Sequence, residues 1–278
     1  MSAGDPLAAV GEAEASGDIA ALFADIRSTL GVGVVNLIWR HLATIEGALP
    51  WAWSAVRPLY VEGAIEAEAE RARERMRLLD LPRVPAEALV AVGLDAAALA
   101  GIRTVLATYD RSNTMNLLAL SALLASLDGS VASGGQVGSG RGVGGGVEGA
   151  LPRLLSEADM APSTWALVRR LNMLGERDEG RVLASMYRHL AHWPGVLALI
   201  WALLAPVDAD GSLGSVIGDN LAAAKARARV LAGRLKASAA ADLPPAQRQA
   251  ARRAIALFVD HPIGKMVSIC RMLRLSIG

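Results

Sequence analysis

Cysteine, aromatic side chains and net charge are all scarce in this chain of 278 residues. The single cysteine, Cys270, excludes an internal disulfide, CxxC redox chemistry and a thiolate metal cluster. The formal net charge is only +1 and no basic stripe runs through the sequence, so nucleic-acid binding lacks its electrostatic basis. The most apolar stretches, 114–127 and 195–207, are shorter than the ~20 residues that a membrane span requires. We expect both to be buried helices.

The amino-terminal segment has no basic region followed by an apolar run, so the sequence predicts no secretory signal peptide. We therefore expect a cytoplasmic protein that binds neither membranes nor nucleic acids.

Alanine and leucine dominate the composition instead. Hydrophobic residues make up 53% of the chain and charged residues 20%, which is the balance of a globular protein. Alanine and leucine favour helices, whereas the β-branched runs that favour strands are scarce. The composition predicts an all-α fold.

The sequence contains an internal repeat, because residues 39–58 and 187–206 align without a gap. Eight of the twenty positions are identical, and an aromatic residue, Trp39 or Tyr187, begins each copy. The identical pairs are Arg40 and Arg188, His41 and His189, Leu42 and Leu190, Ala43 and Ala191, Gly47 and Gly195, Leu49 and Leu197, Trp53 and Trp201, and Pro58 and Pro206. We expect two tandem helical repeats that form a pseudo-dimer, with the functional cleft between them.

The repeat divides the chain into three regions. Residues 1–127 form the first predicted helical repeat and residues 151–278 the second. The glycine-rich segment 128–150 between them is typical of a flexible linker.

Two local predictions concern the first repeat. Asp95 is expected to begin a helix that runs to about Tyr109, and the polar segment 109–113 to break it before another apolar helix. Asn113 would then cap the second of these helices. The alternating glutamate and arginine residues of segment 64–79 predict a solvated helix face.

The histidines do not predict a metal site. His189 and His192 lie three residues apart on one helical face, but no carboxylate is spaced to complete a ligand set. His41 and His189 recur in both copies, which favours a structural role for them. The tryptophans of the repeats are interpreted as core packing, with a wall for a small apolar ligand as the alternative.

Three segments, 24–53, 106–124 and 183–207, resemble the group I D,L-2-haloacid dehalogenases, in order through both halves of the chain. This resemblance implies an all-α pseudo-dimer whose active site lies between the repeats. It also implies hydrolysis of the carbon–halogen bond of 2-haloalkanoic acids by direct attack of an activated water, without a metal or an organic cofactor. In that family an aspartate serves as the base and an asparagine helps to hold the water.

Matched to the family, Asn113 takes the place of the asparagine. The family's Ala-Ser-Asp falls on Ala184, Ser185 and Met186, so a thioether stands where the resemblance implies a carboxylate. Loss of a general base typically costs ~10²–10⁴ in rate. The remaining substrate-binding positions that the resemblance implies are Val34, Leu37 and Phe258.

Three hypotheses for the function follow. The chain is a hydrolase of a 2-haloacid or a similar small carboxylic acid, with His189, one helical turn beyond Met186, as the replacement base. Alternatively, it is a hydrolase of different chemistry in the same pocket, or a non-catalytic binder of a small apolar carboxylic acid. The sequence leaves open whether the protein is a homodimer.

Overall fold

The computed structural model describes residues 7–132, 137–138, 145–176, 182–235 and 243–278, which form helices joined by loops and contain no strand. The first half contains α1 (Gly17–Leu30), α2 (Leu37–Leu42), α3 (Ala48–Val61), α4 (Ala64–Arg75), α5 (Ala86–Ala91) and α6 (Ala96–Leu127). The second half contains η1 (Glu157–Asp159), α7 (Pro162–Met173), α8 (Ser185–Leu190), α9 (Pro194–Ala209), α10 (Ser212–Ala232), α11 (Pro245–Phe258), the π-helical turn η3 (Val259–Ile263) and α12 (Gly264–Ile277). The all-α prediction is confirmed.

The helix boundaries recur at the interval of the sequence repeat. Helix α2 begins at Leu37 and α8 at Ser185, while α4 begins at Ala64 and α10 at Ser212, and both intervals are 148 residues. Where the first half has one long helix, α6, the second half has α11, η3 and α12 in succession. That the two halves form a pseudo-dimer stays a prediction.

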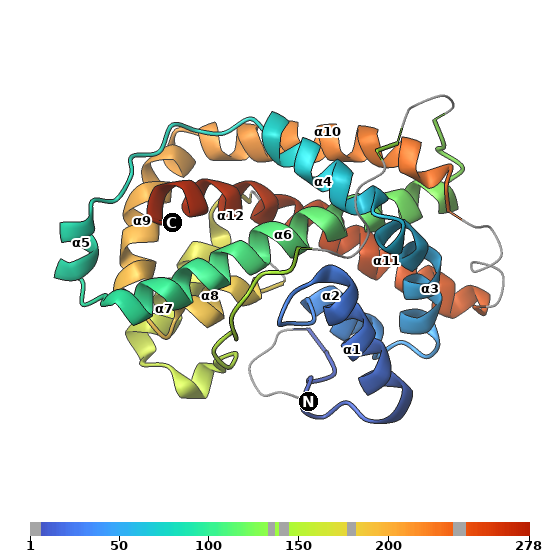
Figure 1. Cartoon of the computed structure of the whole chain (residues 1–278), viewed down its shortest axis with the longest axis horizontal. Coiled ribbons are helices and arrows are strands. Elements are labelled where there is room, and N and C mark those ends of the chain that lie inside the picture. Colours follow the sequence, from blue (N-terminus) through green and yellow to red (C-terminus); the bar gives the residue numbers. More distant parts are fainter. Residues whose placement is uncertain (1–6, 133–136, 139–144, 177–181, 236–242) are drawn as a thin grey trace.

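Helix α6 runs through the centre of the molecule beside α12 (Figure 1). Every residue from Ser112 to Leu123 is buried, so this part of the helix is covered on all its faces. Helices α4 and α10 lie on one side of the α6–α12 pair, and α2 and α8 lie on the other (Figure 1). The middle of α6 is therefore the common wall of several packing layers.

The predicted break at 109–113 is wrong, because α6 is continuous for 32 residues. Asp95 does cap its beginning, where the carboxylate accepts the Ala98 backbone N–H at 2.8 Å. Asn113 is not a cap and lies in the interior of the helix. Polar side chains persist within this helix because neighbouring helices supply partners: Trp39 Nε1 and Tyr60 Oη both donate to Asn116 Oδ1, at 3.2 and 2.9 Å.

Two prolines lie inside helices. Pro58 lies within α3 and Pro206 lies within α9. Pro262, by contrast, lies in the π turn that separates α11 from α12.

The charged segment of α4 is not a wholly solvated face, so that prediction is wrong for two residues. Glu66 and Glu68 are buried. Glu66 pairs with Arg111 of α6 at 2.7 Å, and Glu68 pairs with Arg71 at 2.9 Å and with Arg227 of α10 at 2.5 Å. The glutamates thus tie α4 to α6 and α10.

The described parts of the predicted linker contact the first half. The Val147 N–H donates to Gly31 O at 2.9 Å, and the Gly138 N–H donates to Glu68 Oε1 at 2.8 Å. Gly31 has φ +64, and a Cβ at this position would lie 2.9 Å from Gly146 Cα, so both the turn and the close approach require glycine. Flexibility of 133–136 and 139–144 was also predicted, and these segments lie outside the described residues.

The apolar helices were also considered as membrane spans. Within the described part of the chain, no single helix is long and apolar enough to cross a membrane. Helices α9 and α10 satisfy length and composition only together, as a pair bent by 86°.

Asp110, fully buried on α6, is an anchor between α6 and α12. Arg274 Nη1 lies 2.8 Å and Arg271 Nη1 lies 3.4 Å from its Oδ2. Arg73 of α4 is a third guanidinium near this carboxylate: burial lowers the pKa of Arg73, and the charge of Asp110 opposes that shift. One buried anion therefore holds cations from two other helices near α6.

Replacing Asp110 with alanine is expected to lower the free energy of unfolding by about 3 kcal/mol, because these arginines lose their common counterion. Urea unfolding followed by circular dichroism measures the change. Asp128→Ala is the matched control. Asp128 forms an exposed pair with Arg252 at 2.8 Å, and its loss should cost no more than about 1 kcal/mol. Equal losses in the two variants would contradict the anchoring role of Asp110.

Candidate active site

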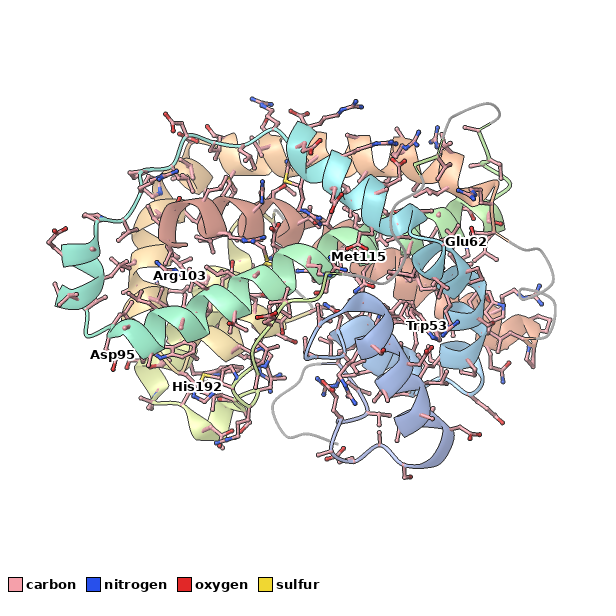
Figure 2. The ribbon with its side chains drawn as sticks, in the orientation of Figure 1. Trp53, Glu62, Asp95, Arg103, Met115 and His192 are labelled. Carbon is pink, nitrogen blue, oxygen red and sulfur yellow. The ribbon has the colours of Figure 1, made fainter. Side chains whose placement is uncertain are left out.

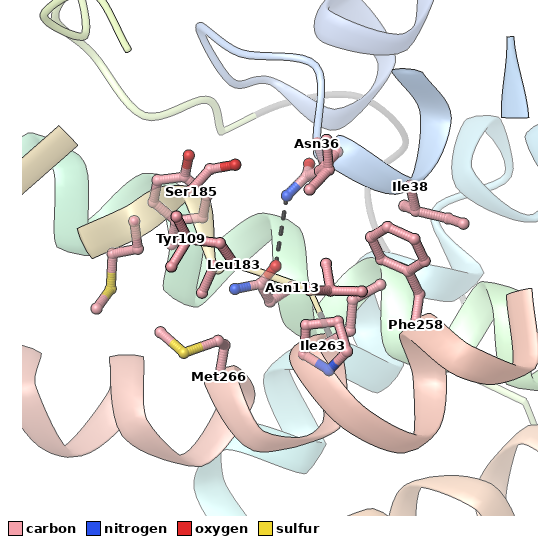
Figure 3. A pocket seen from close by; sticks show the side chains of 14 residues that line it. Asn36, Ile38, Tyr109, Asn113, Leu183, Ser185, Phe258, Ile263 and Met266 are labelled. Atoms are coloured by element: carbon pink, nitrogen blue, oxygen red, sulfur yellow. Dashed lines mark hydrogen bonds between the residues drawn. The ribbon is translucent and has the colours of Figure 1, made fainter. Parts of the chain in front are cut away.

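A small cavity of about 40 Å³ lies between α2, α6, α8 and the α11–η3–α12 segment. This is room for about three water molecules, so a larger ligand requires side chains of the wall to move. Its polar side chains are Asn36, Tyr109, Asn113 and Ser185, and the other residues of its wall are apolar. The two halves of the chain both contribute to the wall, as Figure 3 shows.

Six of the eight predicted site residues line this cavity. Sequence positions far apart in the chain meet here, because α6 brings Asn113 to the start of α2, the start of α8 and the end of α11. The six residues are Asn113, Leu37, Ala184, Ser185, Met186 and Phe258. The other two, Val34 and His189, are buried, but neither belongs to the cavity wall.

Two asparagines form a hydrogen-bonded pair across the cavity. Asn36 Nδ2 donates to Ser112 Oγ at 3.0 Å and to Asn113 Oδ1 at 3.4 Å, the latter drawn as a dashed line in Figure 3. Asn36 Oδ1 is buried without a hydrogen-bond partner. A buried amide oxygen without a partner is costly, so this atom can accept a hydrogen bond from a water or a ligand.

Sulfur atoms lie next to Asn113. The Cys270 thiol is buried and donates to Met186 Sδ at 3.4 Å, while Asn113 Nδ2 approaches Cys270 Sγ at 3.7 Å. Burial raises the pKa of Cys270 well above its usual value, and nearby Asp110 raises it further. The thiol therefore stays protonated and supplies no base.

Tyr109 connects the cavity to His189. The Tyr109 hydroxyl lies 2.9 Å from His189 Nδ1, and burial raises the pKa of Tyr109 above its usual range. Burial lowers the pKa of His189 to about 3, and the charge of Arg188 contributes. A histidine with this pKa is neutral at pH 7, and its Nδ1 can accept the tyrosine proton in a hydrogen bond.

Ser185 provides another polar group at the cavity. Its Oγ is buried close enough to the Tyr109 hydroxyl to lower the pKa of that phenol slightly, although no hydrogen bond of normal geometry is formed between them. A hydroxyl can donate to a carboxylate oxygen. No aspartate or glutamate of the described residues lines the cavity.

Sequence reasoning missed Asn36, and it missed Tyr109 as a site residue. The repeat held a signal for Asn36, because Asn36 precedes α2 at the position where Ala184 precedes α8, again 148 residues apart. Pro262 and Ile263 of the π turn also line the cavity. Apart from the proline itself, nothing in the sequence indicated this turn.

Comparison with known proteins places this geometry in context. No protein-family model matches the sequence. A configuration-inverting 2-haloacid dehalogenase of Alcaligenes xylosoxydans xylosoxydans is 30% identical over 205 residues, which cover 70% of this chain and 67% of that protein. The chain belongs to the 2-haloacid dehalogenase family.

Solved structures of this family share the fold. A D-2-haloacid dehalogenase mutant in complex with D-2-CPA superimposes with a TM-score of 0.77 at 20% identity, over 96% of this chain and 94% of that one. A D-2-haloacid dehalogenase in complex with L-LA gives 0.75 at 20% identity, over 98% and 96%. The helical fold of this family member is therefore the fold of D-2-haloacid dehalogenases along nearly its whole length.

The buried His189 gives a pH dependence of stability. Because its folded pKa of about 3 lies below the ordinary value of 6.5, the unfolded chain binds a proton that the folded chain does not between these values. The contribution of neutral His189 is thus complete above pH 6.5 and is lost as the pH falls toward 3. From pH 7.5 to pH 5.0, we expect wild type to lose about 2 kcal/mol more unfolding free energy than His189→Asn.

Urea unfolding of both proteins at the two pH values measures this difference. An equal loss in wild type and His189→Asn would show that His189 titrates normally in the folded protein.

Proposed function

We propose that this chain binds small 2-haloalkanoic acids, or similar apolar carboxylic acids, in the Asn113 cavity, and that Met186 leaves it with little hydrolytic activity toward them. The observation that carries the proposal is a cavity with unpartnered polar atoms and apolar walls, in which no carboxylate of the described residues takes part. In this proposal the cavity is the site between the two repeats of a pseudo-dimer.

The polar atoms of the cavity suit a water and an acid. Asn113 Nδ2, which approaches Cys270 Sγ at 3.7 Å beside Met186, can donate to the oxygen of a bound water. Asn36 holds the Asn113 amide in this orientation through its hydrogen bond to Asn113 Oδ1. Ser185 Oγ donates to the carboxylate of the acid. Leu37, Phe258 and the other apolar residues exclude competing water and contact the alkyl group.

Hydrolysis requires that this water lose a proton as it attacks the carbon that carries the halogen. A thioether cannot accept that proton, and the neutral Cys270 thiol beside it cannot either. The bound water therefore attacks as neutral water, which is a poor nucleophile. The cavity consequently favours binding over turnover.

One contact favours a second candidate, a hydrolase that uses His189 through Tyr109. The phenol of Tyr109 lines the cavity and is hydrogen-bonded to His189 Nδ1, so a proton from water could pass through the hydroxyl to the imidazole. The low pKa of His189 makes it a weak base, which disfavours this route.

Chloride release from each enantiomer of 2-chloropropionate, compared between wild type and Met186→Asp, tests the proposal. Met186→Asp restores a carboxylate beside Asn113, and we expect its rate to exceed that of wild type by about 10²–10⁴. Met186→Asn is the matched control, because it has the same shape as the aspartate variant but no base, and it should stay as slow as wild type.

Calorimetric titration of wild type with 2-chloropropionate should show saturable binding that Ser185→Ala weakens. A wild-type rate equal to that of Met186→Asp would overturn the role given to Met186. If His189→Asn or Tyr109→Phe abolished such a rate, the second candidate would replace the first. Absence of binding in both wild type and Met186→Asp would overturn the ligand class.

A further inference from the structure

A second, larger pocket lies on the opposite side of the α6–α12 pair. It has a volume of about 390 Å³ and is lined by α4, α6, α10 and α12. Adjacent residues of α6 face different cavities, since Asn113 lines the small one and Thr114 lines this groove. The same holds on α12 for Met266 and Val267. The groove shares no lining residue with the Asn113 cavity.

The floor of the groove is apolar. Leu117, Leu118 and Val267 are each at most 2% exposed, and Met76 and Ala224 flank them half-buried. An aliphatic chain laid on this floor would bury apolar surface at ~25 cal/mol per Å². The volume falls within the ~300–1,000 Å³ range of small-molecule sites.

The neutral polar groups of the groove wall already have partners. Asn220 Nδ2 donates to Arg77 O at 2.8 Å and to Ser268 Oγ at 2.9 Å, and its Oδ1 accepts the Arg77 backbone N–H at 3.0 Å. Thr114 Oγ1 donates to Asp110 O at 2.8 Å. A ligand therefore gains little from these groups.

The rim of the groove is cationic. Glu68 is the single acid among the described lining residues, and it is shared by Arg71 and by a bidentate contact from Arg227. Burial opposes its ionisation, but the hydrogen bonds from Arg227 and Gly138 prevail and lower the pKa of Glu68. Arg75 also lines the groove and is exposed, and no ion pair is seen for it among the described residues. Three guanidinium groups thus face one carboxylate.

We propose that this groove binds an amphipathic organic anion, a carboxylate with a linear aliphatic tail. The carboxylate lies at the rim against Arg75 and Arg71, where the charge excess is positive and the guanidinium forks match it. The tail lies on Leu117, Leu118 and Val267, which present no polar group that it would have to desolvate. Such a ligand is distinct from the small acid proposed for the Asn113 cavity.

Calorimetric titration of the full chain with decanoate, below its micelle concentration, tests this site. Decyltrimethylammonium is the matched ligand, because it has the same tail with a cationic head. We expect saturable one-to-one binding of decanoate, and binding of the cation at least about tenfold weaker because like charges meet at the rim.

Two pairs of variants locate the site. Ala223→Trp fills the groove from an exposed position of α10 and should weaken decanoate binding by more than about tenfold, whereas Ala222→Trp, at the exposed neighbour outside the groove, should not. Arg75→Gln should weaken binding by about fivefold. Arg103→Gln, at an exposed position elsewhere on α6 (Figure 2), should leave it unchanged.

Decanoate binding that fails to saturate, or that Ala223→Trp leaves intact, would overturn the proposal. Equal binding of the cationic amphiphile would overturn the role of the arginines. If 2-chloropropionate competed with decanoate, decanoate would bind in the small cavity. The same would follow if Asn113→Ala abolished decanoate binding while Ala223→Trp left it unchanged. Decanoate binding in the groove stands even if 2-chloropropionate does not bind at all.

Discussion

A helix that is buried on every face is stabilised when neighbouring helices supply partners for its polar side chains, and such contacts on α6 shape the structure. Every residue of α6 from Ser112 to Leu123 is buried. Trp39 and Tyr60 both donate to Asn116 Oδ1, and Arg274 of α12 contacts Oδ2 of Asp110 just before this stretch. These contacts fix how the surrounding helices lie against α6, and so they fix the positions of both cavities.

Several buried polar atoms have no hydrogen-bond partner among the described residues, including Asp110 Oδ1 and Asn116 Nδ2 away from the site and two atoms at the site. Asn36 Oδ1 and Ser185 Oγ are buried without partners, and both belong to residues at the Asn113 cavity. The family's fold has been retained around a cavity whose basic group is proposed to be lost. A buried carboxylate would cost stability without a partner, whereas Met186 and Cys270 fill the same space with apolar sulfur at little cost.

The sequence allowed the fold class, the family and most of the cavity wall to be predicted. The apolar stretches 114–127 and 195–207 were predicted to be helices, and they lie in α6 and α9. The match of Asn113, Ser185 and Phe258 to family positions brought them to one cavity. These predictions succeeded because they depend on local pattern or on similarity that persists through the chain.

Two of the failures involve partners that are distant in the sequence. The polar segment before Asn113 was predicted to be a break, but α6 is continuous there. Its asparagines have partners 56 to 77 residues away: Asn36 donates to Asn113, and Trp39 and Tyr60 donate to Asn116. Glu68 looked solvated until Arg227 of α10 was seen to cover it. A single sequence carries no record of such pairings.

Helix α6 has one more consequence. By sequence it ends the first half, yet α10 and α12 of the second half cover much of its surface. Without them the apolar faces of α6 would meet water, which would destabilise the first half on its own. If the halves were made as separate polypeptides, each would need the other as a template for folding. During synthesis α6 emerges before α10 and α12, so its apolar faces stay uncovered until those helices have been made.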